Sequence, residues 1–146
     1  MPARQAKSFN FIYGKPIVFI QFDAVPGTFP MLIDTGADCT YLPLEWLELL
    51  GHSNKNIKNS YMGGIGARNK IFSHTSVLKF LNDESEIVWA TGKIPIHFCE
   101  GLHNFKHGLI GRDIICNMWE HYTQDTKNID SEKWRFFFVP KELYYQ

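Results

Sequence analysis

Three short segments of the sequence contain residue types from which an active site could be built. In the first, residues 32–38 read Leu-Ile-Asp-Thr-Gly-Ala-Asp, so Asp34 follows an apolar run and precedes small residues. This order predicts a carboxylate in a tight turn at the edge of the core, where it could act as a general acid or base. A purely structural turn is the alternative, because Asp34 could accept a hydrogen bond from its own backbone while Gly36 supplies the turn conformation.

The other two segments each place glycine beside apolar residues. Residues 62–67 read Met-Gly-Gly-Ile-Gly-Ala, and residues 109–113 read Leu-Ile-Gly-Arg-Asp. The former lacks both the Gly-Lys-Ser/Thr of a phosphate-binding loop and the glycine spacing of a dinucleotide-binding turn, so we expect a hairpin tip with unusual backbone freedom. For the latter, a simple strand-to-helix turn with Arg112 at the surface is the alternative to a role in a site.

Histidine and cysteine side chains form a second group that could do chemistry. His97, Cys99, His103 and His107 lie close together in the sequence. Their spacing matches no common structural zinc pattern, so we expect an exposed loop with a buried cysteine and no metal. No Gly-x-Ser-x-Gly nucleophile turn is present, and no cofactor is implied. Cys39 is expected to line the wall of the site, with sensitivity to oxidation as the alternative.

The elements that must position these segments are mostly strands. Runs rich in β-branched and aromatic residues predict strands at residues 9–13, 16–23, 29–33, 75–80, 86–91, 94–98 and 134–139, and a hairpin at 61–72. Apolar residues at helical spacing predict helices at 44–50, entered through Pro43 and ended at Gly51, and at 111–119. Residues 120–133 are polar and are expected to form a loop. The predicted fold class is mostly β with one or two short helices.

Length and composition limit the classes of protein that fit. The chain has 146 residues, 45% of them hydrophobic, and 15 basic residues balance 15 acidic ones. This suits one domain with its own core, and the balance argues against nucleic-acid binding, which needs a basic excess. No apolar run is long enough for a membrane span, and residues 1–7 show no signal peptide. Because three cysteines do not suggest a disulfide framework, we expect a cytoplasmic protein, or a virion or polyprotein-derived one if viral.

In their order along the chain, the three segments resemble the retroviral-type aspartic proteases, or retropepsins. The resemblance covers about residues 16–118 and rests on Asp-Thr-Gly-Ala-Asp, then Met-Gly-Gly-Ile-Gly, then Leu-Ile-Gly-Arg-Asp. It implies a single-lobe fold over residues 1–146, with a core at about 9–118 and a closed β architecture carrying a glycine-rich flap hairpin. Residues 119–146 then form a C-terminal extension, in which we expect 134–139 to be a strand of the dimer interface beside 9–13.

The resemblance also implies roles for individual residues. Asp34 is similar to the catalytic aspartate, with Thr35 in the hydrogen-bonded grip between two active-site loops and Gly36 facing the substrate backbone. Asp38 resembles the residue that pairs with the arginine of the third segment, here Arg112. The implied substrate-binding residues are Ala37, Asp38, Met62, Gly63, Gly64, Ile65 and Gly66, and the implied structural support beneath the loop is Leu109, Ile110, Gly111 and Arg112.

Catalysis of this kind requires a second chain. Aspartic proteolysis uses two carboxylates that share one proton, because like charges about 3 Å apart cannot both ionise. Asp-Thr-Gly occurs once here, since Lys127 follows the other Asp-Thr pair, Asp125-Thr126. The expected function is an aspartic endopeptidase that cuts extended polypeptides as a homodimer, each copy supplying one Asp34. A catalytically silent module for dimerisation or peptide binding is the alternative, which the intact Asp-Thr-Gly disfavours.

Overall fold

Strands predominate in the structure, a computed structural model that describes residues 5–52, 59–64, 67–102 and 106–144. Two short α-helices and three 3-10 turns accompany the strands in these residues, so the predicted mostly-β fold class is confirmed. The strands are β1 Lys7–Asn10, β2 Ile17–Phe22, β3 Phe29–Ile33, β4 Tyr41–Pro43, β5 Asn59–Gly64, β6 Ala67–Leu81, β7 Ile87–Cys99, β8 Gly108–Ile110, β9 Trp119–Asp125 and β10 Arg135–Pro140. The helices are α1 Trp46–Leu49 and α2 Arg112–Ile115, and the 3-10 turns are η1 Glu100–Leu102, η2 Ser131–Lys133 and η3 Glu142–Tyr144.

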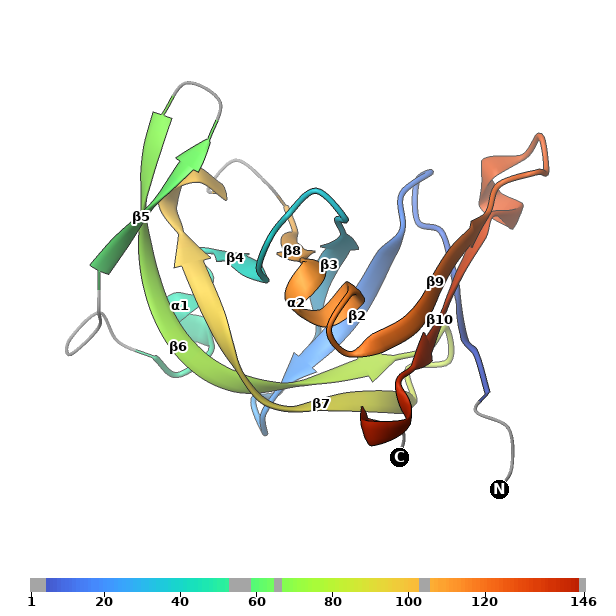
Figure 1. The fold of residues 1–146 in the computed structure, drawn as a ribbon, viewed down its shortest axis with the longest axis horizontal. Helices are drawn as coiled ribbons and strands as arrows, with labels where there is room; N and C mark the ends of the chain where they lie inside the picture. The colour runs from blue at the N-terminus through green and yellow to red at the C-terminus, as the bar shows by residue number, and fades with distance from the viewer. Residues whose placement is uncertain (1–4, 53–58, 65–66, 103–105, 145–146) are drawn as a thin grey trace.

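The larger sheet closes on itself (Figure 1). Its strand order is β2-β3-β8-β4-β7-β6-β5, and a further pairing of β2 with β6 joins its two sides into a ring. The long strand β6 makes this closure possible, because residues 67–72 pair with β5 and residues 78–81 pair with β2, while residues 71–81 also pair with β7. Side chains alternate between the two faces of each strand, and those that point inward build the core. The closed β architecture expected from the sequence is therefore confirmed.

Strands β5 and β6 form a hairpin that projects from the ring (Figure 1). Their register runs from Asn59 opposite Phe72 to Gly64 opposite Ala67. The hairpin predicted for residues 61–72 is confirmed in its strands, whereas Ile65 and Gly66 at its tip lie outside the described residues.

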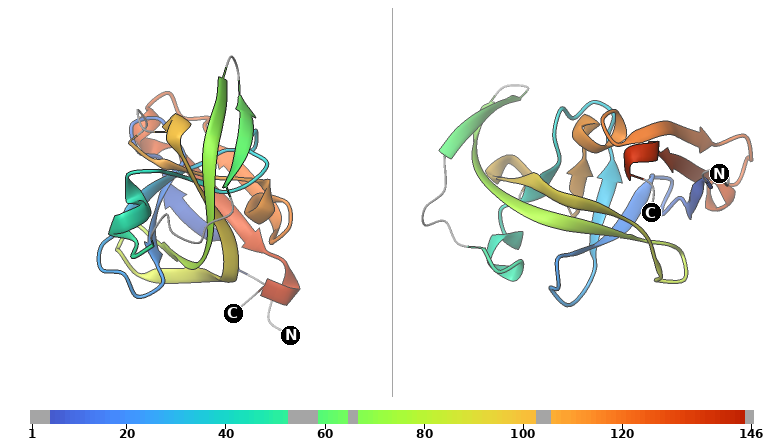
Figure 2. Two further views of the ribbon diagram at one scale, coloured as in Figure 1. Left: turned by 90° about the vertical axis from the view of Figure 1, so that its left-hand side faces the viewer. Right: turned by 60° about the horizontal axis from the view of Figure 1, so that its bottom comes forward.

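A second, three-stranded sheet contains the first and the last strand, β1 and β10, and lies at the opposite end of the molecule from the hairpin (Figures 1 and 2). Its order is β1-β10-β9, so the predicted adjacency of the first and last strands is confirmed. The expectation of a loop over residues 120–133 is wrong, because β9 occupies Trp119–Asp125. Trp119 is the one buried side chain of β9, and such a polar edge strand carries no apolar run that would reveal it in the sequence.

Aromatic side chains join this terminal sheet to the ring. Trp119 stacks on Phe138 with ring centroids 4.0 Å apart, and Phe138 also contacts Phe80 of β6 at 5.6 Å. Phe9 of β1 stacks on Phe136 and Phe138 of β10. All five rings are at most 2% exposed. The terminal sheet is thus packed on the core of its own chain through these rings.

Element boundaries differ from the sequence expectations where tertiary contacts decide them. Strand β4 was not predicted, and the helix expected at 44–50 is shortened to α1, which ends before Gly51 at a φ of +77°. The helix expected at 111–119 is also shorter in the structure, where α2 covers only Arg112–Ile115. The second half of the hairpin predicted at 61–72 and the strand predicted at 75–80 belong to one strand, β6, and the strands predicted at 86–91 and 94–98 merge into β7, which begins at Ile87. No helix in the described residues is long and apolar enough to cross a membrane.

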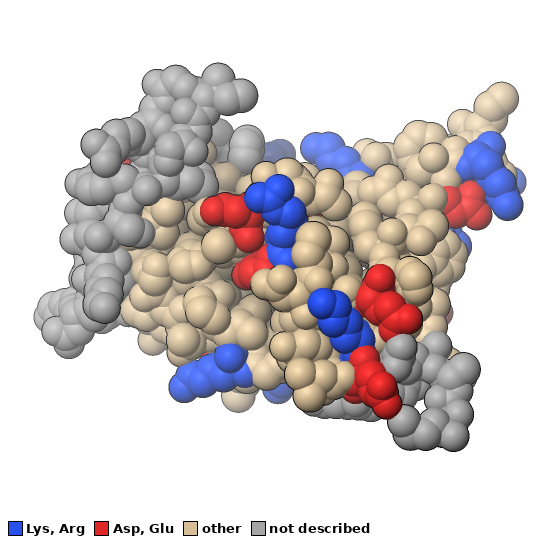
Figure 3. All heavy atoms as spheres, in the orientation of Figure 1, with Lys and Arg blue, Asp and Glu red and all other residues tan. Residues whose placement is uncertain are grey.

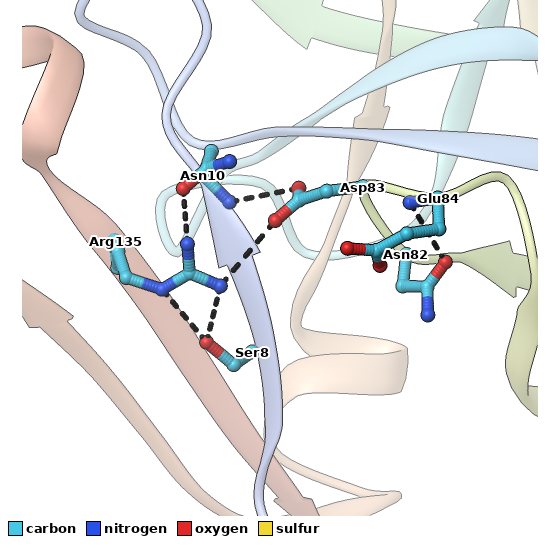
Figure 4. Close-up of polar contacts among 6 residues, drawn as sticks. All are labelled: Ser8, Asn10, Asn82, Asp83, Glu84 and Arg135. Carbon is cyan, nitrogen blue, oxygen red and sulfur yellow. Dashed lines mark hydrogen bonds and ion pairs between the residues drawn. The ribbon is translucent and has the colours of Figure 1, made fainter.

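Polar contacts fix β1 to its neighbours (Figure 4). Arg135 of β10 donates from Nε to Ser8 Oγ at 2.9 Å and from a terminal nitrogen to Asn10 Oδ1, and it pairs with Asp83 at 3.4 Å. Asp83, in the turn between β6 and β7, accepts a hydrogen bond from Asn10 N at 3.1 Å. One guanidinium therefore ties β1, β10 and the turn of the larger sheet together.

Replacing Arg135 should loosen β1. We expect Arg135→Ala to lower the free energy of unfolding by about 1 kcal/mol, a modest value because the cluster is partly exposed. Urea unfolding measures this loss, and hydrogen exchange at the Asn10 amide should become faster. Arg135→Lys is the control, because it keeps the charge but not the fork of donors, and it should recover only part of the stability. Unchanged exchange at Asn10 in Arg135→Ala would contradict the assignment.

Candidate active site

Asp34 lies where strand β3 leaves the sheet. Strands β3 and β8 run parallel, with Leu32 opposite Leu109 and Ile33 opposite Ile110. The Asp34 amide adds a last hydrogen bond to this ladder, donating to Ile110 O at 2.9 Å. The apolar ends of two adjacent strands thus place the acid at the edge of the core, as the sequence predicted.

The turn itself orients the Asp34 carboxylate. Gly36 N donates to Asp34 Oδ1 at 2.9 Å, and Ala37 N donates to Asp34 O at 3.2 Å. Asp34 is half-buried, whereas Thr35 and Gly36 are exposed. A Cβ at position 36 would lie 3.2 Å from Asp34 Oδ1, so glycine leaves the carboxylate room to keep this position. The carboxylate is therefore held by its own turn and still borders the surface.

The start of α2 packs against this loop, backbone on backbone. Arg112 N donates to Ala37 O at 2.9 Å. A Cβ on Gly111 would lie 2.1 Å from the Cys39 carbonyl oxygen, a separation that no side chain allows. Glycine is thus required at position 111 for close approach and not for an unusual dihedral. The third sequence segment therefore lies directly against the first.

Thr40 and Asp113 supply the hydrogen bonds of this contact. The fully buried Thr40 donates from N to Asp113 Oδ2 at 3.1 Å and from Oγ1 to Asp113 Oδ1 at 2.9 Å, and its Oγ1 accepts from Gly111 N at 3.3 Å. Burial raises the pKa of Asp113, an effect that the hydrogen bonds from Thr40 and Ile114 oppose. Neither Thr40 nor Asp113 was given a role from the sequence. The sequence does not show that Thr40 is buried or that Asp113, more than 70 residues away, is its hydrogen-bond partner, so this role could not be predicted.

Asp38 pairs with Tyr41 and not with Arg112. Tyr41 OH donates to Asp38 Oδ1 at 2.6 Å, and no ion pair joins Asp38 to Arg112 in the described part of the chain. The hydrogen bond from Tyr41 lowers the pKa of Asp38, with only a minor contribution from the charge of Arg112. Burial, together with this bond to Asp38, raises the pKa of Tyr41. The expected Asp38–Arg112 pair is wrong, because the Asp38 carboxylate accepts its hydrogen bond from the hydroxyl of Tyr41, three residues further along the chain.

The remaining predicted residues fall into two groups. Leu109 and Ile110 form β8 beside β3, and Ile110 is fully buried there. Met62, Gly63 and Gly64 lie in β5, opposite Asn69, Arg68 and Ala67 of β6. Ile65 and Gly66 lie outside the described residues, so their predicted contact with substrate stays a prediction.

The histidines and the cysteine near the end of β7 make separate contacts. His97 Nδ1 lies 2.8 Å from Ser73 Oγ, and burial lowers the pKa of His97. Cys99 is buried, while His107 Nδ1 lies 3.1 Å from the following carbonyl oxygen. His103 lies outside the described residues, among which no three potential metal ligands cluster. Burial also raises the pKa of the Cys39 thiol, which favours its protonated form.

Charged side chains of both signs lie on the surface. On the face shown in Figure 3, acidic and basic groups alternate and neither sign forms an extended patch. This distribution agrees with the equal numbers of acidic and basic residues in the sequence. Long-range attraction of a strongly charged ligand to this face is therefore weak.

Comparison with known proteins identifies the fold. No protein-family model and no curated protein matches the sequence. Among solved structures, a retropepsin-like aspartic protease from Rickettsia conorii is 14% identical, with a TM-score of 0.63 over 92% of this chain and 99% of that chain. EIAV protease in complex with the inhibitor HBY-793 is 18% identical, with a TM-score of 0.48 over 70% of this chain and 86% of that chain.

The likeness to the Rickettsia structure establishes the architecture. The chain has the single-lobe fold of the retropepsin-like aspartic proteases, as the resemblance of the three segments implied. At this level of identity the likeness concerns the path of the backbone, so the chemistry must be argued from the residues.

Removing the buried hydroxyl should weaken the support of the active-site loop. Thr40→Val has nearly the same shape but leaves the Gly111 amide without a hydrogen-bond partner and removes one of the two hydrogen bonds that Asp113 Oδ1 accepts, the other being from Ile114 N. We expect it to lower the free energy of unfolding by about 2 kcal/mol. Thr40→Ser keeps the hydroxyl and should lose clearly less in the same urea titration. Equal losses in the two variants would mean that the hydroxyl does not stabilise the loop.

The Tyr41 hydrogen bond should be visible in the titration of Asp38. In Tyr41→Phe, we expect the pKa of Asp38 to rise towards its ordinary value of 3.8, measured by NMR of the carboxyl carbon. A carboxyl group whose pKa is lowered by folding stabilises the folded state at pH values above its unfolded-state pKa. The difference in free energy of unfolding between wild type and Tyr41→Phe should therefore shrink as the pH falls below 3.8 and through the lowered pKa of Asp38. Arg112→Ala should shift the pKa of Asp38 less. A larger shift in Arg112→Ala would reverse the assignment.

Proposed function

We propose that the protein is an aspartic endopeptidase that hydrolyses peptide bonds in extended polypeptides. Its catalytic unit is a homodimer in which each copy supplies one Asp34 carboxylate. The observation that carries the proposal is the turn after β3, which holds a half-buried Asp34 beside exposed Thr35 and Gly36, in a fold shared with retropepsin-like aspartic proteases.

The second carboxylate has to come from a second copy. Asp-Thr-Gly occurs once in the sequence, and the closed ring of one chain contains one turn of this kind. A twofold axis beside this turn supplies a matching acid in matching geometry. Thr35, next to Asp34 and exposed, is then placed to link the two loops through its hydroxyl.

The proposed reaction needs a water molecule and two carboxyl groups that share one proton. The ionised carboxylate removes a proton from the water, and the water oxygen attacks the carbonyl carbon of the peptide. The protonated carboxyl of the other copy donates its proton to the carbonyl oxygen, giving a tetrahedral diol. Proton transfer to the amide nitrogen then lets the C–N bond break, releasing an amine and an acid. No covalent intermediate, metal or cofactor takes part.

Substrate binding falls to the hairpin and the walls around Asp34. The β5–β6 hairpin acts as a flap that closes over an extended peptide, which adds to the flap and the active-site floor as a strand would. Met62, Gly63 and Gly64 of β5 approach the peptide from the flap. Ile33 and Ala37, both buried and apolar, favour apolar side chains next to the cleaved bond.

Replacing the proposed catalytic acid tests this reaction. Asp34→Asn should lower kcat/KM for cleavage of casein or a peptide library at mildly acidic pH by about 10²- to 10⁴-fold, with an unchanged circular dichroism spectrum. Glu84→Gln is the matched control, because it makes the same carboxylate-to-amide change at an exposed turn and should cleave like wild type. Equal cleavage by wild type and Asp34→Asn would mean that Asp34 is not the catalytic acid, and no cleavage by either protein would favour the silent dimerisation or peptide-binding module.

Mixing copies tests whether the active unit is a dimer. Adding an excess of Asp34→Asn protein to wild type forms mixed dimers with a single carboxylate, so total activity should fall as the excess grows. An excess of Glu84→Gln should not inhibit. If Asp34→Asn has no effect at any ratio, the active unit is a single chain.

A further inference from the structure

Two histidine rings stack between the end of helix α1 and the base of the β5–β6 hairpin. His52 follows α1, and its ring centroid lies 4.3 Å from that of His74 in β6, with 31° between the ring planes. Both rings also contact Phe98 of β7, at 5.7 and 5.8 Å. Three rings from three parts of the chain therefore meet near the end of the molecule from which the hairpin projects (Figure 1). Neither histidine takes part in the proposed reaction.

His74 occupies a position on the core side of β6. Because side chains alternate along a strand, His74 lies on the same face as Phe72 and Ser76, and both of these are buried. The Nε2 atom of His74 is buried and has no hydrogen-bond partner in the described part of the chain. The imidazole is therefore packed as an apolar ring would be, and a charge at this place would have no partner.

His52 covers the ring of His74 from the side of α1. The His52 amide donates to Leu47 O at 3.0 Å, and Gly51 turns the chain before it with a φ of +77°. Leu47 and Leu50 are buried, so α1 is anchored in the core independently of this histidine. Because the His52 side chain is only half-buried, a change of rotamer brings its imidazole into water while α1 stays in place.

The surroundings of His52 favour its neutral form. Burial lowers the pKa of His52, and His74 lowers it further, because two stacked rings cannot both carry a charge at low cost. Asp23, in the turn after β2, acts in the opposite direction with a smaller effect, and both of its carboxylate oxygens already accept hydrogen bonds from β6. The acidic residues next to and within α1, Glu45 and Glu48, are exposed to water.

We infer that the pair of His52 and His74 is an acid-sensitive latch at the base of the hairpin, which opens when His52 is protonated and its ring moves into water. The imidazolium is solvated there, whereas in the stack it faces a second imidazole and a buried phenyl ring. Release of His52 uncovers His74, two positions from Phe72, where the pairing of β6 with β5 ends. The base of the hairpin then loses a packing partner, so it opens more easily in acid.

The latch regulates access to the candidate active site, and this consequence rests on the proposed function. Two carboxyl groups that share one proton work in acid, and a flap has to open before a peptide can reach Asp34. Protonation of His52 below pH 6.5 loosens the hairpin in the same range, and the neutral pair holds the hairpin above it.

The pH dependence of stability tests the latch. A histidine whose pKa is lowered by folding stabilises the folded state fully above its ordinary value of 6.5, and this contribution is lost as the pH falls from 6.5 to the lowered pKa. Unfolding of wild type in urea should therefore take up protons between pH 6.5 and 5. His52→Phe keeps a ring without the charge and should take up fewer protons, by up to one. His97 has the same influence in both proteins, so the difference isolates His52.

Two glutamine variants provide the control. His52→Gln removes the titrating group together with the ring, and it should lose the same part of the pH dependence even if it is less stable. His121→Gln makes the identical change at a side chain that is 69% exposed, and it should keep the pH dependence of wild type. A wild-type pH dependence in the His52 variants would overturn the inference.

Titration of the ring by NMR measures the coupling within the pair. The pKa of His52 should lie below 6.5, and it should rise in His74→Phe, which removes the second imidazole and keeps a ring in its place. A pKa of His52 at or above 6.5 in wild type, or no rise in His74→Phe, would overturn the assignment of the pair.

Hydrogen exchange shows whether the proton acts at the hairpin. Between pH 7 and 5.5, protection factors at the amides of Phe72 and His74 should fall in wild type by up to about tenfold per pH unit, and should stay constant in His52→Phe. The Asn10 amide exchanges when β1 opens at the other end of the molecule, and its protection should not change. Constant protection at the hairpin base of wild type, or an equal fall at Asn10, would overturn the latch.

These measurements need no cleavage, so the two proposals can fail separately. A latch that opens in acid in a protein that never cleaves peptides would refute the proposed function alone. Cleavage by a protein whose hairpin protection does not depend on pH would refute the latch alone.

Discussion

The architecture of the site depends on one close backbone contact, between the loop that follows β3 and the start of α2. Gly111 leaves no space for a side chain against Cys39, and the Arg112 amide closes the contact by donating to Ala37 O. The two segments lie far apart in the sequence, yet parallel pairing of β3 with β8 brings their ends together. The position of Asp34 thus follows from sheet topology and not from local sequence alone.

Near this contact, some polar side chains are engaged in hydrogen bonds that support the loop, whereas Asp34 keeps its carboxylate accessible at the surface. Thr40 and Asp113 satisfy each other inside the protein, and Tyr41 occupies one oxygen of Asp38. Without partners, the buried Thr40 and the partly buried Asp113 would cost stability, and their mutual hydrogen bonds hold the loop in one conformation. Asp34 differs from them, because its contact comes from its own turn and its side chain still borders the surface. A rigid base beneath a surface-bordering carboxylate is what acid–base chemistry requires.

The elements that could be predicted from the sequence are those marked by a local pattern of residues. Apolar runs marked the buried strands, glycine marked the turns, and the order of three short segments indicated the class of fold. Strand β9 was missed because its single buried residue, Trp119, cannot mark a periodicity. The Asp38–Arg112 pair was wrong because spacing along the chain does not show which hydrogen-bond donor is nearest in space. Thr40 was missed for the same reason.

The terminal sheet separates folding from association. Phe9, Phe136 and Phe138 stack within one chain, and Trp119 covers them from β9, so the apolar area of this sheet is buried without a partner. A sheet built from exchanged strands would leave those rings exposed in a single copy and would make the fold depend on dimerisation. Here a folded single chain keeps its core. Under the proposed function it lacks only the second carboxylate, so protein concentration controls catalysis and the stability of each chain does not depend on association.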